Sequence, residues 1–241
     1  MRRMVAQVAL AAGASAAGRQ EIATAIEAAS REIDGVVDAH TGVHLDLSVG
    51  GGDLTWDLLF EEDRALAAFC EQVEGQGATG FVASLGKPFA SLVGRVDSVE
   101  AAIPEPISEG TGRPGLVGIK RTLWLRVEPD ASPDARERFE AETPLLARAV
   151  PAIRNWRWSR VREVAPRPMS LRWTHLWEQE FETVAGLEQD YMSSPCHWGY
   201  VDRWFDPEMP DRIVDLWLAH LACPEHAPVL SWEASAPGGK E

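Results

Sequence analysis

The sequence predicts an α+β protein built from two tandem ferredoxin-like repeats, each with the element order βαββαβ. Two observations predict this fold class. Strand and helix patterns follow that order before residue 104 and again after residue 118. The segment Trp56-Asp57-Leu58-Leu59-Phe60-Glu61 also aligns with Trp177-Glu178-Gln179-Glu180-Phe181-Glu182, at the same place in each repeat. Two such repeats bury the open faces of their sheets against each other, so we expect one chain to form an intrachain α+β barrel.

The first half supplies one repeat, which we place at residues 1–110. A short apolar run predicts a first strand, and isoleucines at helical spacing then predict an amphipathic helix. Alternating apolar and polar residues predict a second strand, which ends at the glycine turn of residues 50–53. The expected elements are strand 4–12, helix 18–33, strand 36–49, strand 54–60, helix 62–74 and strand 96–103.

The second half supplies the other repeat, placed at 119–233, after a glycine- and proline-rich linker at 104–118. Ser132-Pro133 is a typical helix start, and Pro144 is expected to kink that helix. Along strand 171–181, alternation places Leu171, Trp173, His175, Trp177 and Gln179 on one face. The other elements are strands 119–127 and 153–164, helix 183–191, a helix or terminal strand at 211–220, and a disordered tail at 234–241.

The amino-acid composition limits the kinds of molecule that the protein is expected to bind. The net charge of -14 and the pI near 4.9 argue against nucleic acid and anionic membranes, which both need a basic face. Three cysteines without a CxxC spacing fit a reducing compartment, and no apolar run approaches a membrane span. The N-terminus has features of a weak secretion signal, but Gln7 interrupts its short apolar core, which favours a strand. We therefore expect a cytoplasmic protein with a small-molecule substrate, either monomeric with an internal pseudo-dimer or weakly dimeric.

Tyr191 and His197 are the candidate catalytic pair. They lie six residues apart, at the end of a predicted helix and across the turn at Pro195. A phenol and an imidazole at such a corner can share one pocket, where together they hold or move a proton. The alternative is a buried tyrosine with a hydrogen-bonded hydroxyl and a histidine that caps the turn.

The two repeats differ at this point of the alignment. Cys70 falls near Tyr191, and Ala78 falls at His197, so the first repeat is expected to lack the pair. Of the ten tryptophans, only Trp56 precedes residue 119. This aromatic second half is typical either of a cavity for a flat apolar ligand or simply of a filled core.

The second half resembles the stress-responsive dimeric A/B barrel family from residue 119 to about 218. The marks of the resemblance are Ile119-Lys120-Arg121-Thr122-Leu123-Trp124-Leu125, Val150-Pro151-Ala152-Ile153, Trp173-Thr174-His175-Leu176 and Phe181-Glu182. The most specific is Tyr191-x-x-x-Pro195-x-His197-x-Gly199-Tyr200. The resemblance implies a dimeric α+β barrel, here formed within one chain.

The resemblance also implies a chemistry, because a cyclase of this family uses this tyrosine and histidine in an aldol condensation of a polyketide thioester. His197 would then be the base, Tyr191 the group that polarises a carbonyl, and His175 another pocket histidine. The usual first-strand histidine is Arg121 here, a departure that favours a carboxylate or enolate in the pocket. The remaining substrate contacts are expected from Trp124, Trp158, Trp173, Trp177 and Tyr200.

The residues therefore predict a cofactor-independent lyase, cyclase or isomerase that acts through an enolate on a small oxygenated aromatic or polyketide-like carbonyl compound. Aldol closure, isomerisation, dehydration and decarboxylation all remain open. We expect no cofactor and no metal, because no carboxylate stands at a helpful spacing beside His175 and His197. The alternatives are a non-catalytic binder of an apolar ligand, a cofactor-free monooxygenase and a haem protein.

Overall fold

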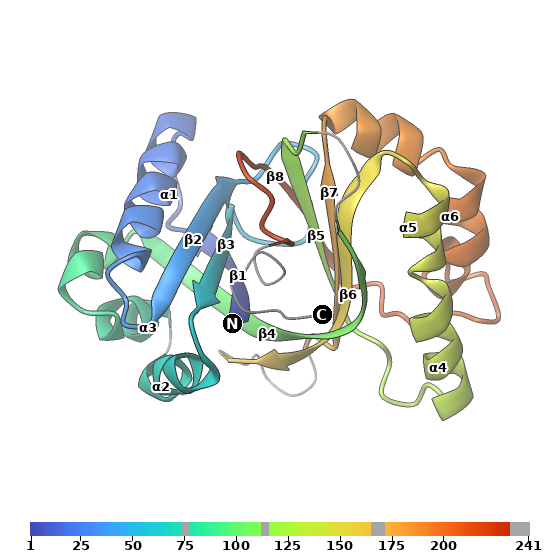
Figure 1. Cartoon of the computed structure of the whole chain (residues 1–241), viewed down its shortest axis with the longest axis horizontal. Helices are drawn as coiled ribbons and strands as arrows, with labels where there is room; N and C mark the ends of the chain where they lie inside the picture. Colours follow the sequence, from blue (N-terminus) through green and yellow to red (C-terminus); the bar gives the residue numbers. More distant parts are fainter. Residues whose placement is uncertain (74–77, 112–115, 165–171, 232–241) are drawn as a thin grey trace, which may run out of the picture.

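Eight antiparallel strands form one curled sheet with the order β2-β3-β1-β4-β6-β7-β5-β8. The structure is a computed structural model that describes residues 1–73, 78–111, 116–164 and 172–231. The strands of the two halves make two walls that face each other, and the helices lie outside each wall (Figure 1). The chain thus has the expected fold of two ferredoxin-like repeats closed into an intrachain dimeric α+β barrel.

The first half follows the predicted order and adds short helices before its last strand. Helix α1 begins after Ser15, whose hydroxyl accepts a hydrogen bond from the Gly18 amide, and it buries Ile22 and Ile26 against the sheet. The elements are β1 (Arg2–Leu10), α1 (Ala16–Ser30), β2 (Val36–Val43), β3 (Leu54–Phe60), α2 (Asp63–Val73), α3 (Ala78–Ser84), η1 (Lys87–Leu92) and β4 (Val96–Gly110).

The second half repeats this plan. Ser132 caps α4 as predicted, and the helix breaks at Pro144 into a second short piece, α5. The elements are β5 (Ile119–Leu125), α4 (Pro133–Glu142), α5 (Leu145–Ala149), β6 (Ile153–Glu163), β7 (His175–Phe181), η3 (Gly186–Tyr191), α6 (Pro195–Tyr200), η4 (Asp202–Trp204) and β8 (Ala219–Pro224).

Strand β4 joins the two walls and is longer than predicted. Its first part pairs with β1, and its second part pairs with β6 as far as Gly110, which lies opposite Trp156. Residues 104–110 of the expected linker are therefore strand. Beyond Ala102, β4 no longer pairs with β1, so Pro104 and Pro106 lie on a stretch with one strand neighbour, where a missing N–H costs little; the register also shifts beside Pro106. Residues 112–115 lie outside the described residues.

The ends of the sheet approach each other beyond β2. Val49 and His220 form an antiparallel bridge, and the Leu45 amide donates to the Ala222 carbonyl over 2.8 Å. The terminal strand is β8, so the prediction of one regular element over 211–220 is wrong for most of its length. Within that stretch, Val214 bridges Val127 before β8 begins. The predicted tail at 234–241 lies outside the described residues.

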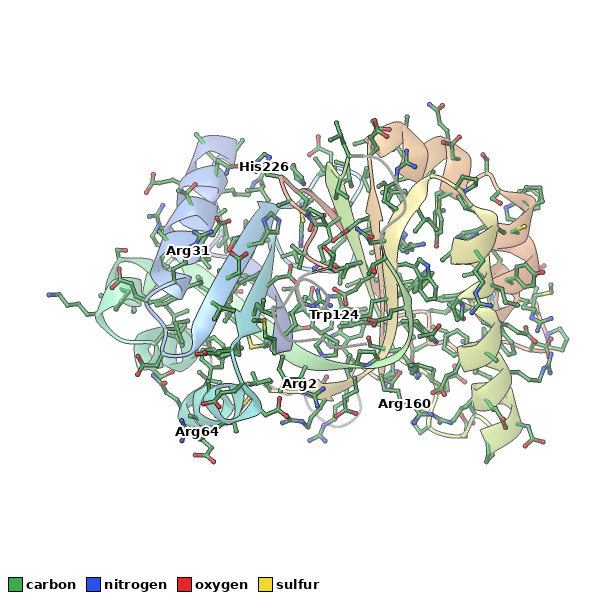
Figure 2. All side chains as sticks on the ribbon, viewed as in Figure 1. Arg2, Arg31, Arg64, Trp124, Arg160 and His226 are labelled. Carbon is green, nitrogen blue, oxygen red and sulfur yellow. The ribbon has the colours of Figure 1, made fainter. Side chains whose placement is uncertain are left out.

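Each wall has an outer face covered by helices and an inner face turned toward the other wall. Trp56 and Trp177, the aligned residues of the two repeats, both pack on outer faces, in the cores of their own halves. The inner faces share a small apolar cluster around Trp124 and Leu176, and Figure 2 shows Trp124 between the walls. No helix in the described part of the chain has the length and apolar character needed to cross a membrane.

Candidate functional site

The Tyr191–His197 corner is built by two short helices on the outer face of the second wall. The turn η3 is π-helical and ends at Tyr191, where its last amides bond back to the Leu187 and Gln189 carbonyls. Ser194 then caps α6, and Pro195 occupies its first turn. Because α6 starts so soon after η3 ends, His197 returns over Tyr191. Single π-helical turns of this kind occur frequently at functional sites.

Tyr191 and His197 are in direct contact. Their ring centroids lie 4.9 Å apart with the planes at 82°, an edge-to-face arrangement. Tyr191 is fully buried; its hydroxyl makes no well-aligned hydrogen bond among the described residues, and its polar neighbour is the Arg121 guanidinium. An unpaired buried hydroxyl costs about 1–3 kcal/mol, a cost that a bound oxygen atom would remove.

Asp202 orients the imidazole of His197. Its Oδ1 lies 2.9 Å from His197 Nδ1, an ion-pair distance without the geometry of a hydrogen bond. Because a carboxylate can only accept, this contact favours the proton on Nδ1 and leaves the lone pair on Nε2, which makes no hydrogen bond within the described ranges. Burial holds the pKa of His197 below its usual value, Asp202 opposes that shift, and Arg121 adds to it. A neutral imidazole at neutral pH is the result.

Arg121 lies beside this pair on strand β5. Its guanidinium carbon is 5.0 Å from the Tyr191 ring centroid, and its Nη1 donates to Gln179 Oε1 over 2.6 Å. Its Nε and Nη2 approach His220 Nε2 at 3.0 and 2.7 Å. Arg121 is 2% exposed, so a cation is held in the outer-face core next to a phenol and two imidazoles.

These residues border one small cavity of about 150 Å³. Arg121, His197 and His220 supply its nitrogen atoms, and Asp202 supplies a carboxylate. Tyr191 adjoins the cavity through its contacts with His197 and Arg121 and is not part of its lining. The apolar lining consists of Leu123, Met192, Val201, Phe205 and Leu218. The structure therefore brings together the predicted Tyr191, His197 and Arg121.

His175 lies at a different place on the same face. It is the first residue of β7, four residues and about 13 Å of strand before Gln179, the β7 residue that contacts Arg121. Its ring stacks on Trp158 at 4.9 Å, and its Nε2 lies 3.1 Å from Glu140 Oε1. This hydrogen bond is the largest of the effects that lower the pKa of Glu140 to about 2. His175 is thus a packed, hydrogen-bonded core histidine, away from the cavity.

The tryptophans that were predicted to contact the substrate do not line this cavity. Trp158 and Trp177 pack edge to face at 5.9 Å in the outer-face core. Trp124 and Trp173 pack together at 6.0 Å on the inner side of the wall. Trp173 departs from the predicted alternation because regular strand pairing begins only at His175, and Leu171 lies outside the described residues. Tyr200 is on the exposed side of α6, with 37% of its surface accessible.

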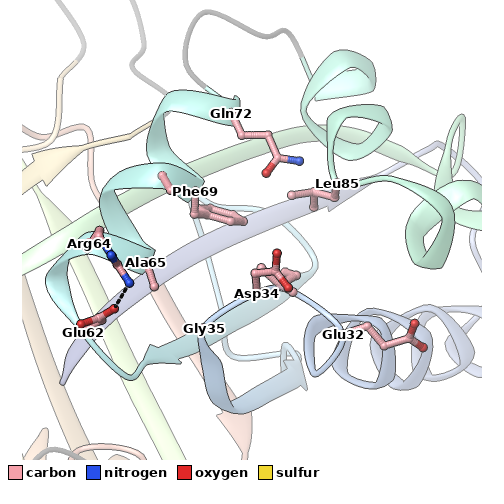
Figure 3. A pocket seen from close by; sticks show the side chains of 11 residues that line it. Glu32, Asp34, Gly35, Glu62, Arg64, Ala65, Phe69, Gln72 and Leu85 are labelled. Carbon is pink, nitrogen blue, oxygen red and sulfur yellow. Dashed lines mark hydrogen bonds and ion pairs between the residues drawn. The ribbon is translucent and has the colours of Figure 1, made fainter.

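A larger groove of about 560 Å³ lies in the first half, between α2 and the loop after α1 (Figure 3). Glu32, Asp34, Glu62 and Arg64 contribute its charges, and its described lining includes no histidine or tyrosine. The strand pairs also differ between the halves. Met4 pairs with Leu58 where Arg121 pairs with Gln179, and both Met4 and Leu58 are fully buried. Cys70 packs against the first core, and the side chain of Ala78 is not described.

A comparison with family models assigns the second half. The model of the stress responsive A/B barrel domain matches residues 119–215. We call this matched segment the A/B barrel domain. This A/B barrel domain contains Arg121, Tyr191, His197 and Asp202, whereas His220 follows it on β8.

Two solved structures resemble nearly the whole chain, including the part outside the A/B barrel domain. An anthrone oxidase-like protein superimposes with a TM-score of 0.57 at 13% identity, covering 92% of this chain and 89% of its own. A putative monooxygenase from Fusobacterium nucleatum gives a TM-score of 0.53 at 9% identity, with coverages of 94% and 95%. At these identities the likeness concerns the fold. No curated protein sequence matches the chain.

Sequence reasoning missed Asp202 and His220. Asp202 follows α6 at the start of η4, and only the fold of that corner shows that it reaches His197. His220 belongs to β8, whose place beside β5 could not be read from its pattern. Among the residues that the structure describes, no group of three His, Cys, Asp or Glu side chains is arranged to hold a metal ion.

Proposed function

We propose that the A/B barrel domain is an acid–base enzyme that removes a proton next to the carbonyl group of a small oxygenated compound and stabilises the resulting enolate. His197 acts as the base, and Tyr191 and Arg121 stabilise the oxyanion. The reaction class is that of cofactor-independent lyases, cyclases and isomerases. The observation that carries the proposal is the contact between a neutral imidazole and a buried phenol whose hydroxyl makes no well-aligned hydrogen bond among the described residues.

The state of His197 supports its role as base. Asp202 fixes the proton on Nδ1, so Nε2 can accept a proton from a substrate in the cavity. The imidazolium that forms is stabilised by the Asp202 carboxylate 2.9 Å away. A carboxylate, an imidazole and a substrate C–H bond in this arrangement form a general-base site. General-base catalysis contributes roughly 100- to 10,000-fold to a rate.

Tyr191 and Arg121 support the oxyanion. Loss of the α proton moves negative charge onto the carbonyl oxygen, which then needs donors already in place. The Tyr191 hydroxyl makes no well-aligned hydrogen bond among the described residues, and the Arg121 charge lies over the same ring and beside that hydroxyl. A carbonyl oxygen that reaches between them gains one neutral and one charged donor. The proton stays on His197 until it returns to carbon or to a leaving group.

Turnover of a panel of β-keto acids, 1,3-diketones and aromatic ketones tests the proposal. We expect His197→Ala to lower kcat by roughly 100-fold or more and Tyr191→Phe to lower it by roughly 100-fold, with unchanged folding. Trp198→Phe is the matched control, because Trp198 is 67% exposed on the same helix as His197. Near-parental turnover in both site variants would rule out the assignment.

Oxidation by dioxygen is a second candidate, which the named relatives favour. An anthrone oxidase-like protein and a putative monooxygenase share this fold, and a carbanion formed by His197 is an electron-rich partner for dioxygen. The same panel assayed in an oxygen electrode separates the two functions. Dioxygen consumption that depends on His197 favours the oxygenase, and turnover under argon favours the lyase, cyclase or isomerase.

A further inference from the structure

The Arg121 guanidinium is a buried charge without a carboxylate partner. Its hydrogen-bond acceptors are the Gln179 amide oxygen and His220 Nε2, and the Tyr191 phenol lies beside it and interacts with its charge. No carboxylate forms an ion pair with it within the part of the chain that the structure describes. A buried guanidinium stays charged, and an unpaired buried charge is costly, so this site gains from a bound anion.

His220 holds the Arg121 guanidinium in place. Arginine can only donate, so the two short contacts fix His220 Nε2 as an acceptor and leave the proton on Nδ1. The positive charge of Arg121, together with burial, lowers the pKa of His220 to about 2, which keeps this imidazole neutral. His220 lines the cavity, and its Nδ1–H has no acceptor among the described residues.

The two cavity histidines therefore carry the same tautomer, with the proton on Nδ1, but they use opposite edges of the ring. His197 turns Nδ1 toward Asp202 and keeps a lone pair on Nε2, whereas His220 accepts from Arg121 through Nε2 and has its N–H on the far edge. Asp202 is the one acidic group in the described lining, and it is engaged with His197 and 44% exposed. Its repulsion of an anion is weakened by solvent. One side of the cavity thus accepts a proton and the other side donates to an anion.

We propose that Arg121, held in place by His220, binds the carboxylate of the substrate, so that this anion clamp selects compact carboxylate-bearing carbonyl compounds over neutral ones. This inference deepens the proposed function and rests on it. His220 is a positioning residue: its Nε2 accepts from the Arg121 guanidinium and fixes its direction. The cavity of about 150 Å³ is below the roughly 300 Å³ of common ligand pockets, which fits a single ring or a short chain.

Benzoate and benzamide are the probes, because they have nearly the same shape and differ in charge. Binding to the full chain is measured by calorimetry and by tryptophan fluorescence. We expect benzoate to bind at least about tenfold more tightly than benzamide, and added salt to reduce this preference only weakly because the site is buried. Equal affinities, or no benzoate binding at millimolar concentration, would overturn the proposal without any variant.

Variants then assign the preference to its residues. Arg121→Gln and His220→Ala are expected to reduce the ratio of benzoate affinity to benzamide affinity to near one, and His220→Gln to restore part of it because the amide oxygen can accept from Arg121. His226→Ala is the matched control, since His226 is exposed and lines another pocket, beside α1 (Figure 2). A folded His220→Ala protein with the parental ratio would remove His220 from the clamp.

The binding assay does not require His197, the proposed catalytic base. His197→Ala is expected to keep the preference for benzoate while losing turnover. If benzoate shows no preference but His197-dependent turnover is found, the anion clamp is wrong and the proposed function stands. If the preference is found without turnover, the clamp stands and the acid–base function fails.

Discussion

At the residue scale, His197 can act as a base only while its imidazole is neutral. Burial is the main effect that keeps its pKa below the usual 6.5, and the nearby Arg121 charge adds to it. Because the neutral form persists above the folded-state pKa, the lowered value extends the active pH range downward. The acid limb of kcat/KM is therefore expected below pH 6.5.

Titration of the His197 ring by NMR checks this directly. We expect a midpoint below 6.5 in the parent protein and a still lower one in Asp202→Asn, because Asp202 opposes the shift. His226→Ala serves to assign the signals of an exposed histidine. A midpoint at or above 6.5, or an upward shift on removal of the Asp202 charge, would contradict the account of this imidazole.

The residues of the candidate site differ in how well their place in it could be predicted from the sequence. Tyr191 and His197 are close in the chain and separated by a helix-breaking turn, so local geometry alone brings them together. Arg121 lies on the first strand of the second half. It was a candidate because the resembling family usually has a histidine at that position. His220 is 99 residues from Arg121 and lies on a strand without a clear pattern. Its role depends on the strand order, which no local signal reveals.

At the element scale, the glycine turn after β2 shows where the chain has no room for a side chain. A Cβ on Gly52 would lie 2.4 Å from the Val8 carbonyl oxygen and 2.7 Å from the Ala9 nitrogen, both backbone atoms of β1. Since backbone cannot move aside as a side chain can, Gly52→Ala is expected to destabilise the protein by about 1–3 kcal/mol.

Urea denaturation measures this effect, with Gly199→Ala as the control. Gly199 belongs to the family motif of α6, yet a Cβ there meets nothing within 4 Å. We expect its midpoint to stay near the parental value. A Gly52→Ala protein as stable as the parent would show that the turn does not pack on β1 as described.

The strand and helix order was predictable because each element has its own period or cap. The length of β4 was not, since Pro104, Pro106 and the following glycines indicate a linker when neighbouring strands are unknown. The strand persists because it passes from β1 to β6, and its prolines lie beyond Ala102, where β4 pairs with β6 and no longer with β1. Non-local pairing overrides the local signal there.

At the scale of the whole molecule, the two walls are joined by a buried network of four charges. Arg3 and Lys120 come from the first strand of each half, and Asp57 and Glu178 come from the aligned third strands. Arg3 Nη1 lies 2.9 Å from both carboxylates, and Lys120 Nζ lies 2.6 Å from Asp57 and 3.2 Å from Glu178. Each half therefore supplies one cation and one anion to the same network.

Lys120→Met tests how much this network contributes. Burial lowers the pKa of Lys120, but Asp57 and Glu178 more than offset it and raise the pKa above its usual value. Removing the lysine leaves an uncompensated buried carboxylate, at an expected cost of about 3–5 kcal/mol. The double variant Lys120→Met with Asp57→Leu restores the balance and should be more stable than Lys120→Met alone. Additive losses in urea denaturation would contradict a coupled network.

The central claim is that His197 removes a proton from carbon, and hydrogen exchange into deuterated water measures that step whatever the final product. A β-keto acid or aromatic ketone from the panel is incubated with the protein in D2O, and deuterium at the α carbon is followed by mass spectrometry. The account predicts incorporation with the parent protein, with Trp198→Phe unaffected and His197→Ala at least roughly 100-fold slower. Incorporation by His197→Ala at the parental rate would contradict it.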